Sequence, residues 1–207
     1  MRRIETMEDV AEGAAWLAAA HPRWAHALRE TGLPPLRRRR DGFEELLRAI
    51  VAQQVSVAAA SAIFARLKAA RLTGPRKVAW ATEDELRACG LSGQKVRYAK
   101  ALAAAGIDFP ALRDAPTEEV VAALIGVPGI GVWTAEIYAM FALGHPDVFA
   151  PGDLALQEGA RMLFGMEARP RERALREWAV PWSPWRAVAA RMLWAYYARE
   201  KRREGTV

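Results

Sequence analysis

The sequence predicts an all-α protein, and two observations support that prediction. Apolar residues recur at helical spacing along most of the chain, while runs typical of strands are almost absent. Glycine, proline and polar capping residues divide the apolar pattern into segments of helical length. The chain has 207 residues, of which 52% are hydrophobic and 26% charged, so it can form one good core or two small lobes.

The starts and stops of the apolar patterns place the individual helices. Asp41 is a candidate cap for a helix over residues 43–51. Thr82 and Glu85 have the spacing of a capping box, and Gly90 ends that short helix. Further helices are predicted to open at Pro116 and to cover residues 55–67, 93–105, 131–143, 153–164, 171–178 and 185–199. We expect residues 41–115 to form one helical lobe, and residues 1–40 with 116–207 to form the other.

The charge balance favours a polyanionic partner. Lysine and arginine number 30 against 24 aspartates and glutamates, which gives a net charge of +6, with basic runs at residues 37–40 and 199–203. Nucleic acid and an acidic membrane surface both fit this charge, and solvated helix faces would show the same runs. No apolar run reaches the roughly 20 residues that span a membrane, and no apolar signal segment opens the chain.

Cysteine and histidine usage predicts a protein without a metal site. The single cysteine, Cys89, excludes an internal disulfide and a cysteine-ligated zinc or iron–sulfur site. The three histidines, His21, His26 and His145, have no metal-binding spacing. We therefore expect a protein of the reducing cytoplasm with no membrane partner.

The stretch LIGVPGIGVWTAEIYAMFALG, residues 124–144, joins two helical patterns by a very short turn inside a predicted hairpin over residues 118–143. Glycines at both ends of the turn would let backbone N–H groups face outward at the start of the second helix. Such a turn is an anion site suited to a nucleic-acid phosphate, and we assign Gly129, Gly131 and the Thr134 hydroxyl to it. A tight helical hairpin that uses glycine only for its dihedral angles gives the same pattern.

Asp153 opens the next predicted helix after the hairpin. The helix over residues 131–143 is on the order of 20 Å long, and the loop that follows can extend to about 30 Å. The chain can therefore carry Asp153 back beside the hairpin. Taken alone, Asp153 is most simply a helix N-cap. Near an anion-binding turn, however, a carboxylate is suited to facing a developing cation.

Three stretches together resemble the helix–hairpin–helix DNA glycosylases, and more narrowly the bacterial 3-methyladenine DNA glycosylase II group. They are LIGVPGIGVWTAEIYAMFALGHPDVFAPGDLALQ, LLRAIVAQQVSVAAASAIFARL and WSPWRAVAARMLWAYY, and the matches run from about residue 43 to residue 197. The resemblance implies one glycosylase domain over residues 1–207, with its active-site cleft between two helical lobes. It also implies double-stranded DNA containing damaged bases as the partner.

In that family an aspartate at the position of Asp153 performs the chemistry. The target nucleotide is flipped out, and the bond between the sugar and an alkylated purine such as 3-methyladenine or 7-methylguanine is hydrolysed. Asp147 lies in the same loop, and we expect it to be structural. Bifunctional relatives carry a nucleophilic lysine at the position of Trp133. Because this motif has no lysine, the resemblance implies base release without lyase activity.

The resemblance also assigns the substrate contacts. Trp133 and Trp194 correspond to the aromatic walls of the base pocket, where a cationic base gains from stacking on indole. Ile137 stands where a family member carries an aromatic residue, with Tyr138 beside it, so the shape of the pocket differs here. Trp194 also suits a fully buried helix, because its helix carries apolar residues on two faces.

Gln53 and Gln54 lie at the bend that in this family fills the hole left by the flipped base. Gln54 corresponds to the residue that fills this hole, the wedge residue. An ordinary helix junction can also carry a polar residue at such a position. No cofactor is expected, but in the family a monovalent cation can be bound by hairpin carbonyls. We expect a monomer acting in the bacterial cytoplasm on nucleoid DNA. A non-enzymatic helix–hairpin–helix module that only binds DNA, and a glycosylase for oxidised, deaminated or mismatched bases, are the alternatives.

Overall fold

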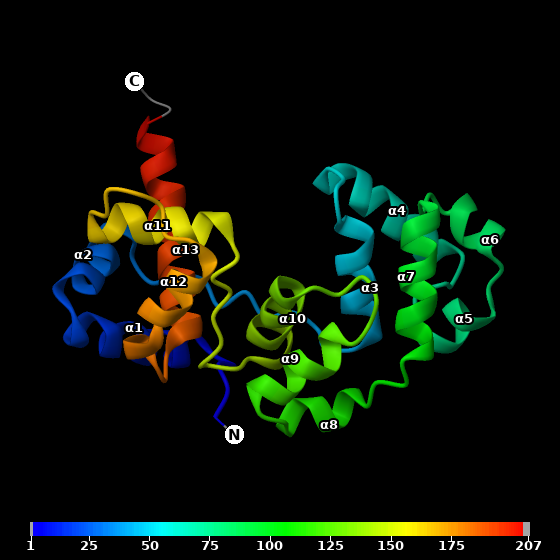
Figure 1. The fold of residues 1–207 in the computed structure, drawn as a ribbon, viewed down its shortest axis with the longest axis horizontal. Helices are drawn as coiled ribbons and strands as arrows, with labels where there is room; N and C mark the ends of the chain where they lie inside the picture. The colour runs from blue at the N-terminus through cyan, green and yellow to red at the C-terminus, as the bar shows by residue number, and fades with distance from the viewer. Residues whose placement is uncertain (1, 205–207) are drawn as a thin grey trace. The chain divides into compact units, whose positions relative to one another are not determined.

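The computed structural model describes residues 2–204, and every regular element within them is a helix (Figure 1). The helices are grouped into two compact units. Unit 1 combines Met1–Arg38 with Ala139–Val207, and unit 2 is Arg39–Tyr138. The all-α prediction is therefore confirmed, and so is the prediction of two helical lobes.

Unit 1 is arranged around its last helix. Its elements are α1 (Met7–Ala20), α2 (Pro22–Thr31), a π-helical turn (Ala139–Leu143), α11 (Leu154–Phe164), α12 (Glu172–Trp178), a 3₁₀ turn (Val180–Trp182) and α13 (Arg186–Glu204). α13 packs on α1, α2 and α11, and it is the long orange-to-red helix in Figure 1. Aromatic rings in edge contacts fill the space beside it, with the Trp182 ring centroid 5.0 Å from that of Trp24.

Unit 2 is built around α3 and α7. Its helices are α3 (Phe43–Ala52), α4 (Val57–Ala69), α5 (Pro75–Trp80), α6 (Glu83–Ala88), α7 (Gly93–Ala104), α8 (Phe109–Asp114), α9 (Thr117–Ile125) and α10 (Val132–Tyr138). The apolar stripe of α3 is buried, as its helical spacing predicts, and α3 packs on α4 and α7. Lys95 on α7 is also buried, and its Nζ donates to the Val51 carbonyl at 2.7 Å, near the end of α3.

The boundary between the units differs from the one that we expected. The hairpin of α9 and α10 belongs to unit 2 and not to the unit that contains the C-terminal helices. The reason lies in the packing, because α10 contacts both α9 and α3. The chain leaves unit 2 after Tyr138, where α10 passes into the π-helical turn.

Two local predictions need correction. The helix predicted over residues 131–143 is α-helical only to Tyr138, and the turn that follows is widened, with His145 N–H donating to the Ala139 carbonyl at 3.0 Å. Asp41 is not the cap of α3. Gly42 holds that position with a φ of 109°, and the Asp41 carboxylate instead pairs with Arg113, accepting from Nη2 at 3.1 Å.

The local capping signals are confirmed. The Thr82 hydroxyl accepts from Glu85 N–H at 3.2 Å, and the Glu85 carboxylate accepts from Thr82 N–H at 2.6 Å, which completes the capping box of α6. Both α5 and α8 are helices that the sequence patterns did not predict. Each is six residues long, too short to show an apolar period.

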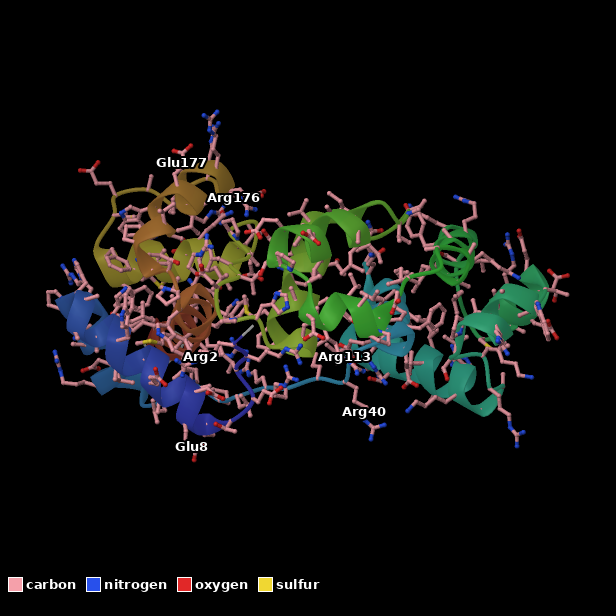
Figure 2. All side chains as sticks on the ribbon, turned by 90° about the horizontal axis from the view of Figure 1, so that it is seen from below. Arg2, Glu8, Arg40, Arg113, Arg176 and Glu177 are labelled. Carbon is pink, nitrogen blue, oxygen red and sulfur yellow. The ribbon has the colours of Figure 1, made fainter. Side chains whose placement is uncertain are left out.

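The basic run at residues 37–40 lies where the two units join in sequence. All four arginines are exposed, and Arg40 extends away from the ribbon in Figure 2. Arg39 is paired with Glu45 at 3.1 Å, so part of the positive charge is balanced within unit 2. Among the described helices, none has the length and apolar character that a membrane crossing requires.

The crossing of α11 and α13 is unusually close at Gly159. A Cβ atom at this position would lie 2.8 Å from the Leu193 carbonyl oxygen and 3.4 Å from Tyr197 Cβ. The obstacle at 2.8 Å is backbone, which cannot rotate away as a side chain can. Gly159 therefore allows an approach between the two helices that no other residue permits.

We predict that Gly159→Ala destabilises the protein by about 1–3 kcal/mol, the usual cost of overpacking a core. Urea unfolding would measure the change. Gly74→Ala is the matched control, because a Cβ at Gly74 meets nothing within 4 Å and its φ of −111° suits alanine. Equal stability of the two variants would show that the helices can separate without cost.

Candidate active site

Asp153 is the N-cap of α11, as its position before the helical pattern suggested. Its Oδ1 accepts hydrogen bonds from Ala155 N–H at 2.9 Å and Leu156 N–H at 3.0 Å. The same oxygen accepts a third bond from the Trp194 indole Nε1–H at 3.1 Å. The carboxylate is half-buried, and three donors fix its direction.

Trp194 therefore has a contact that the sequence did not reveal. We expected its indole to be a wall of the base pocket, but its N–H edge is directed at Asp153. Its ring lies beside Phe141, with centroids 5.7 Å apart and planes at 30°. The close approach of α11 and α13 brings the two partners together, since Gly159 packs against the Leu193 carbonyl, one residue before Trp194.

Asp147, the competing carboxylate of the loop, is held by groups at the start of α13 and just before it. It accepts from Arg186 Nε at 2.7 Å and from the Ser183 hydroxyl at 2.8 Å. Burial raises the pKa of the Asp147 carboxyl, but the hydrogen bonds from Arg186 and Ser183 outweigh it, so the pKa lies below its usual range. Asp147 thus fastens its loop to the start of α13.

The two glycines of the hairpin turn in unit 2 have different surroundings. Gly129 has a φ of 93°, and a Cβ there would lie 2.3 Å from Tyr98 Cγ. Gly131 is different, because its Cβ would meet nothing within 4 Å. Its side faces open space, and the first N–H groups of α10, including that of the half-buried Thr134, have no acceptor within the helix.

Gln53 and Gln54 have separate roles at the bend between α3 and α4. The Gln53 side-chain amide donates to the Gly129 carbonyl at 2.8 Å and so ties the bend to the hairpin turn. Gln54 is exposed and adopts a φ of 55°, which is uncommon for a residue with a side chain and is concentrated at functional sites. Its strained backbone presents the side chain outward.

A groove of ≈ 580 Å³ in unit 2 joins the bend to the hairpin. The sequence motifs did not single out the lining residues that lie at the cap and in the first turns of α7. The lining residues are Gln53, Gln54, Val55, Ser92, Gln94, Lys95, Tyr98, Gly129, Ile130 and Gly131. The capping residue Ser92, whose hydroxyl accepts from Lys95 N–H at 3.3 Å, was the available signal.

The remaining predicted substrate contacts differ in exposure. Trp133 is 48% exposed and Ile137 is half-buried, so both remain accessible within unit 2. Tyr138 is only 4% exposed. Its hydroxyl oxygen accepts from Gly42 N–H at 2.7 Å, so Tyr138 secures the start of α3.

Among the described residues, no group of three or more His, Cys, Asp or Glu side chains could hold a metal ion. Cys89 is buried and free, and burial raises its thiol pKa against the opposing effect of Arg66. A nucleophilic cysteine needs the opposite shift. The polar groups that remain as candidates are the Asp153 carboxylate in unit 1 and the backbone N–H groups at the start of α10 in unit 2.

Comparison with known proteins shows which family the chain belongs to. The sequence pattern described as "HhH-GPD superfamily base excision DNA repair protein" matches residues 47–184. The chain belongs to the HhH-GPD superfamily. The resemblance to helix–hairpin–helix glycosylases is thereby confirmed.

The chain is also similar to individual proteins of known name. The chain is 32% identical to DNA-3-methyladenine glycosylase 1 of Schizosaccharomyces pombe, over 75% of this chain and 72% of that protein. It is 31% identical to DNA-3-methyladenine glycosylase 2 of Escherichia coli, over 74% of this chain and 57% of that protein. A crystal structure described as a DNA-3-methyladenine glycosidase from Bacillus halodurans superposes with a TM-score of 0.84 at 29% identity, covering 98% of this chain and 95% of that one.

We predict that Tyr138→Phe lowers stability at neutral pH by about 1–3 kcal/mol, because Gly42 N–H loses its buried acceptor. The difference in stability between the two proteins should also depend on pH. Burial raises the pKa of Tyr138 to about 12, against its ordinary value of 10. Folding therefore favours the neutral phenol. The stability that this phenol contributes is present below pH 10 and is lost as the pH rises toward 12. Urea unfolding of both proteins from pH 8 to pH 12 would test this. A constant difference across that range would contradict it.

Proposed function

We propose that this chain is a monofunctional DNA glycosylase that removes alkylated purines, of the 3-methyladenine and 7-methylguanine type, in base excision repair. The observation that carries the proposal is the Asp153 carboxylate, whose Oδ1 is held by two backbone donors and the Trp194 indole. A helix cap needs only the backbone donors. A third donor from another helix makes sense for a carboxylate whose direction matters to a reaction.

The proposed reaction hydrolyses an N-glycosidic bond. A nucleotide flipped out of the duplex presents its sugar to Asp153, and the bond from C1′ to the base nitrogen breaks with its electron pair leaving on the base. Positive charge develops on the sugar, and the negative Asp153 stabilises it. Asp153 also orients the water that adds to C1′ and takes its proton. The products are the free base and an abasic sugar.

An alkylated purine suits a site without a dedicated general acid. A base that already carries a positive charge becomes neutral when it takes the bonding electrons, so it needs no added proton. Trp133 and Trp194 offer indole faces that stabilise a cationic base by roughly 0.5–2 kcal/mol each. No lysine occupies the hairpin motif, where Trp133 stands, so the proposed enzyme releases the base without cutting the strand.

The proposed partner is double-stranded DNA that contains a damaged base, bound by a monomer in the bacterial cytoplasm at the nucleoid. The S. pombe relative supports the choice of DNA, because its structure is described as a complex with abasic DNA, and it superposes with a TM-score of 0.75 at 28% identity over 88% of this chain and 95% of that one. In this chain the turn at Gly129 and Gly131 would bind a phosphate. Exposed Gln54 would fill the space that the flipped base leaves.

Base release from methylated duplex DNA by the wild-type protein and by Asp153→Asn tests the proposal. Asparagine caps a helix as well as aspartate does, so the variant should fold normally but release no 3-methyladenine. Asp108→Asn is the matched control, because Asp108 caps α8 in the same way and accepts from Ala111 N–H at 3.0 Å. Strand breaks should appear only after alkali. Binding without release by the wild-type protein would indicate a non-enzymatic DNA-binding module or another lesion.

We predict that Gly131→Ala weakens duplex binding without weakening the fold. A methyl group at Gly131 meets nothing within 4 Å of the protein, so the free energy of unfolding should not fall. It would, however, stand where a phosphate must approach the backbone. We expect a loss of affinity on the order of tenfold, or about 1.4 kcal/mol, measured by fluorescence anisotropy with an abasic duplex. Affinity equal to that of Gly74→Ala would mean that the phosphate binds elsewhere.

A further inference from the structure

Arg191 is a charged residue in the interior of unit 1. It lies in the middle of α13 and is only 3% exposed. Its guanidinium donates to the carbonyls of three segments, namely Ala187 at 2.8 Å, Met140 at 3.3 Å and Leu36 at 3.4 Å. All three acceptors are backbone carbonyls. Arg191 therefore joins α13 to the π-helical turn and to the segment after α2.

The charge of Arg191 is costly where it lies. Within the described part of the chain no carboxylate pairs with it, and Arg38 and Arg37 add further positive charge nearby. Burial first, and then these two arginines, lower the pKa of Arg191 to about 10. The folded protein thus holds the proton less tightly than the unfolded chain does, so at neutral pH the buried charge opposes folding. An apolar side chain of similar length would serve packing better, and the presence of arginine calls for another reason.

The contacts of Arg191 lead to Asp153 through two intervening aromatic rings. Its Cζ lies over the Phe141 ring, 4.7 Å from the centroid. The Phe141 ring lies beside the Trp194 indole at 5.7 Å, and that indole donates to Asp153 at 3.1 Å. Phe141 and the Met140 carbonyl both belong to the π-helical turn. One guanidinium therefore holds both the ring and the backbone of the turn that supports Trp194.

We propose that Arg191 is a positioning residue for base excision, which fixes Phe141 beneath Trp194 and so directs the Trp194 hydrogen bond to Asp153. The proposal rests on the proposed function of Asp153. Arginine suits the task because its planar group can donate to several carbonyls in one plane and lie on an aromatic ring at the same time. Methionine can fill the volume and contact the ring, but it cannot donate to the carbonyls and carries no charge.

Arg191→Met is the variant that tests the proposal. The single-turnover rate of base release should fall about tenfold or more, as a small misplacement of a reacting group can cause. Affinity for an abasic duplex should not change. The melting temperature should change little, because removing a buried charge offsets the loss of a donor to the Leu36 and Met140 carbonyls. Arg191→Lys keeps the charge without the planar fork, and its rate should lie between the two.

A second readout does not depend on activity. The protein has eight tryptophans, so the indole N–H signal of Trp194 in a proton–nitrogen correlation spectrum can be assigned with Trp194→Phe. In Arg191→Met and in Phe141→Leu this signal should move toward that of an indole without a hydrogen-bond acceptor. Arg173→Met is the matched control. Arg173 lies on α12 of the same unit and pairs with Glu177 at 3.1 Å, and its loss should leave both the signal and the rate unchanged.

The outcomes separate this proposal from the proposed function. A wild-type protein that releases no base would refute the proposed function, while the Trp194 signal would still show whether Arg191 supports the indole. An active wild-type protein with an unchanged rate and an unchanged Trp194 signal in Arg191→Met would overturn the positioning role. A slower variant with a lowered melting temperature and an unmoved signal would also overturn it, because Arg191 would then support only the fold.

Discussion

The hydrogen bond from Trp194 to Asp153 depends on how closely α11 and α13 can approach. Asp153 caps the start of one helix and Trp194 lies in the middle of the other, so a small shift of either helix would separate a donor and acceptor that are 3.1 Å apart. Gly159 permits the approach by leaving room for the Leu193 carbonyl. The other features of unit 1 maintain this arrangement. The pair of Asp147 with Arg186 fastens the loop before Asp153 to the start of α13, and the π-helical turn supplies Phe141 beside the indole.

In unit 2 the groups that side chains hold in place are backbone groups instead of a carboxylate. Side chains whose partners are backbone groups connect its functional turns. Gln53 donates to the Gly129 carbonyl, Lys95 donates to the Val51 carbonyl, and Tyr138 accepts from Gly42 N–H. These bonds fix the bend at Gln54 and the hairpin relative to α3, which leaves the exposed groups free to bind a ligand. The proposed phosphate-binding role of the turn requires such support, because its backbone donors must be held in a fixed geometry.

The sequence predicted those features whose causes are local. The capping box of Thr82 and Glu85 and the N-cap at Asp153 were predictable because the partners lie within three residues. The bond from Gly42 N–H to the Tyr138 hydroxyl could not be predicted, because the two residues are 96 positions apart in the chain. Asp41 likewise looked like a cap because its real partner, Arg113, is 72 residues distant. The Trp194 bond to Asp153 was missed for the same reason, since a family motif identifies residues without giving the direction of a side chain.

Arg191 marks the limit of reading a helix from its periodicity. On α13 the residues on either side of it are buried, so a charged residue between them would be expected at the rim of the apolar face. Instead its guanidinium lies in the interior and is surrounded by carbonyls. Positions where a residue contradicts its environment and still satisfies its hydrogen bonds are more informative about function than positions that agree with it, because packing alone would have selected a different side chain. Asp153 is less informative in this sense, because its role as a helix cap already explains an aspartate at that position. Arg191 also joins backbone segments through its carbonyl acceptors, but the ring beneath its guanidinium is the one that lies beside Trp194.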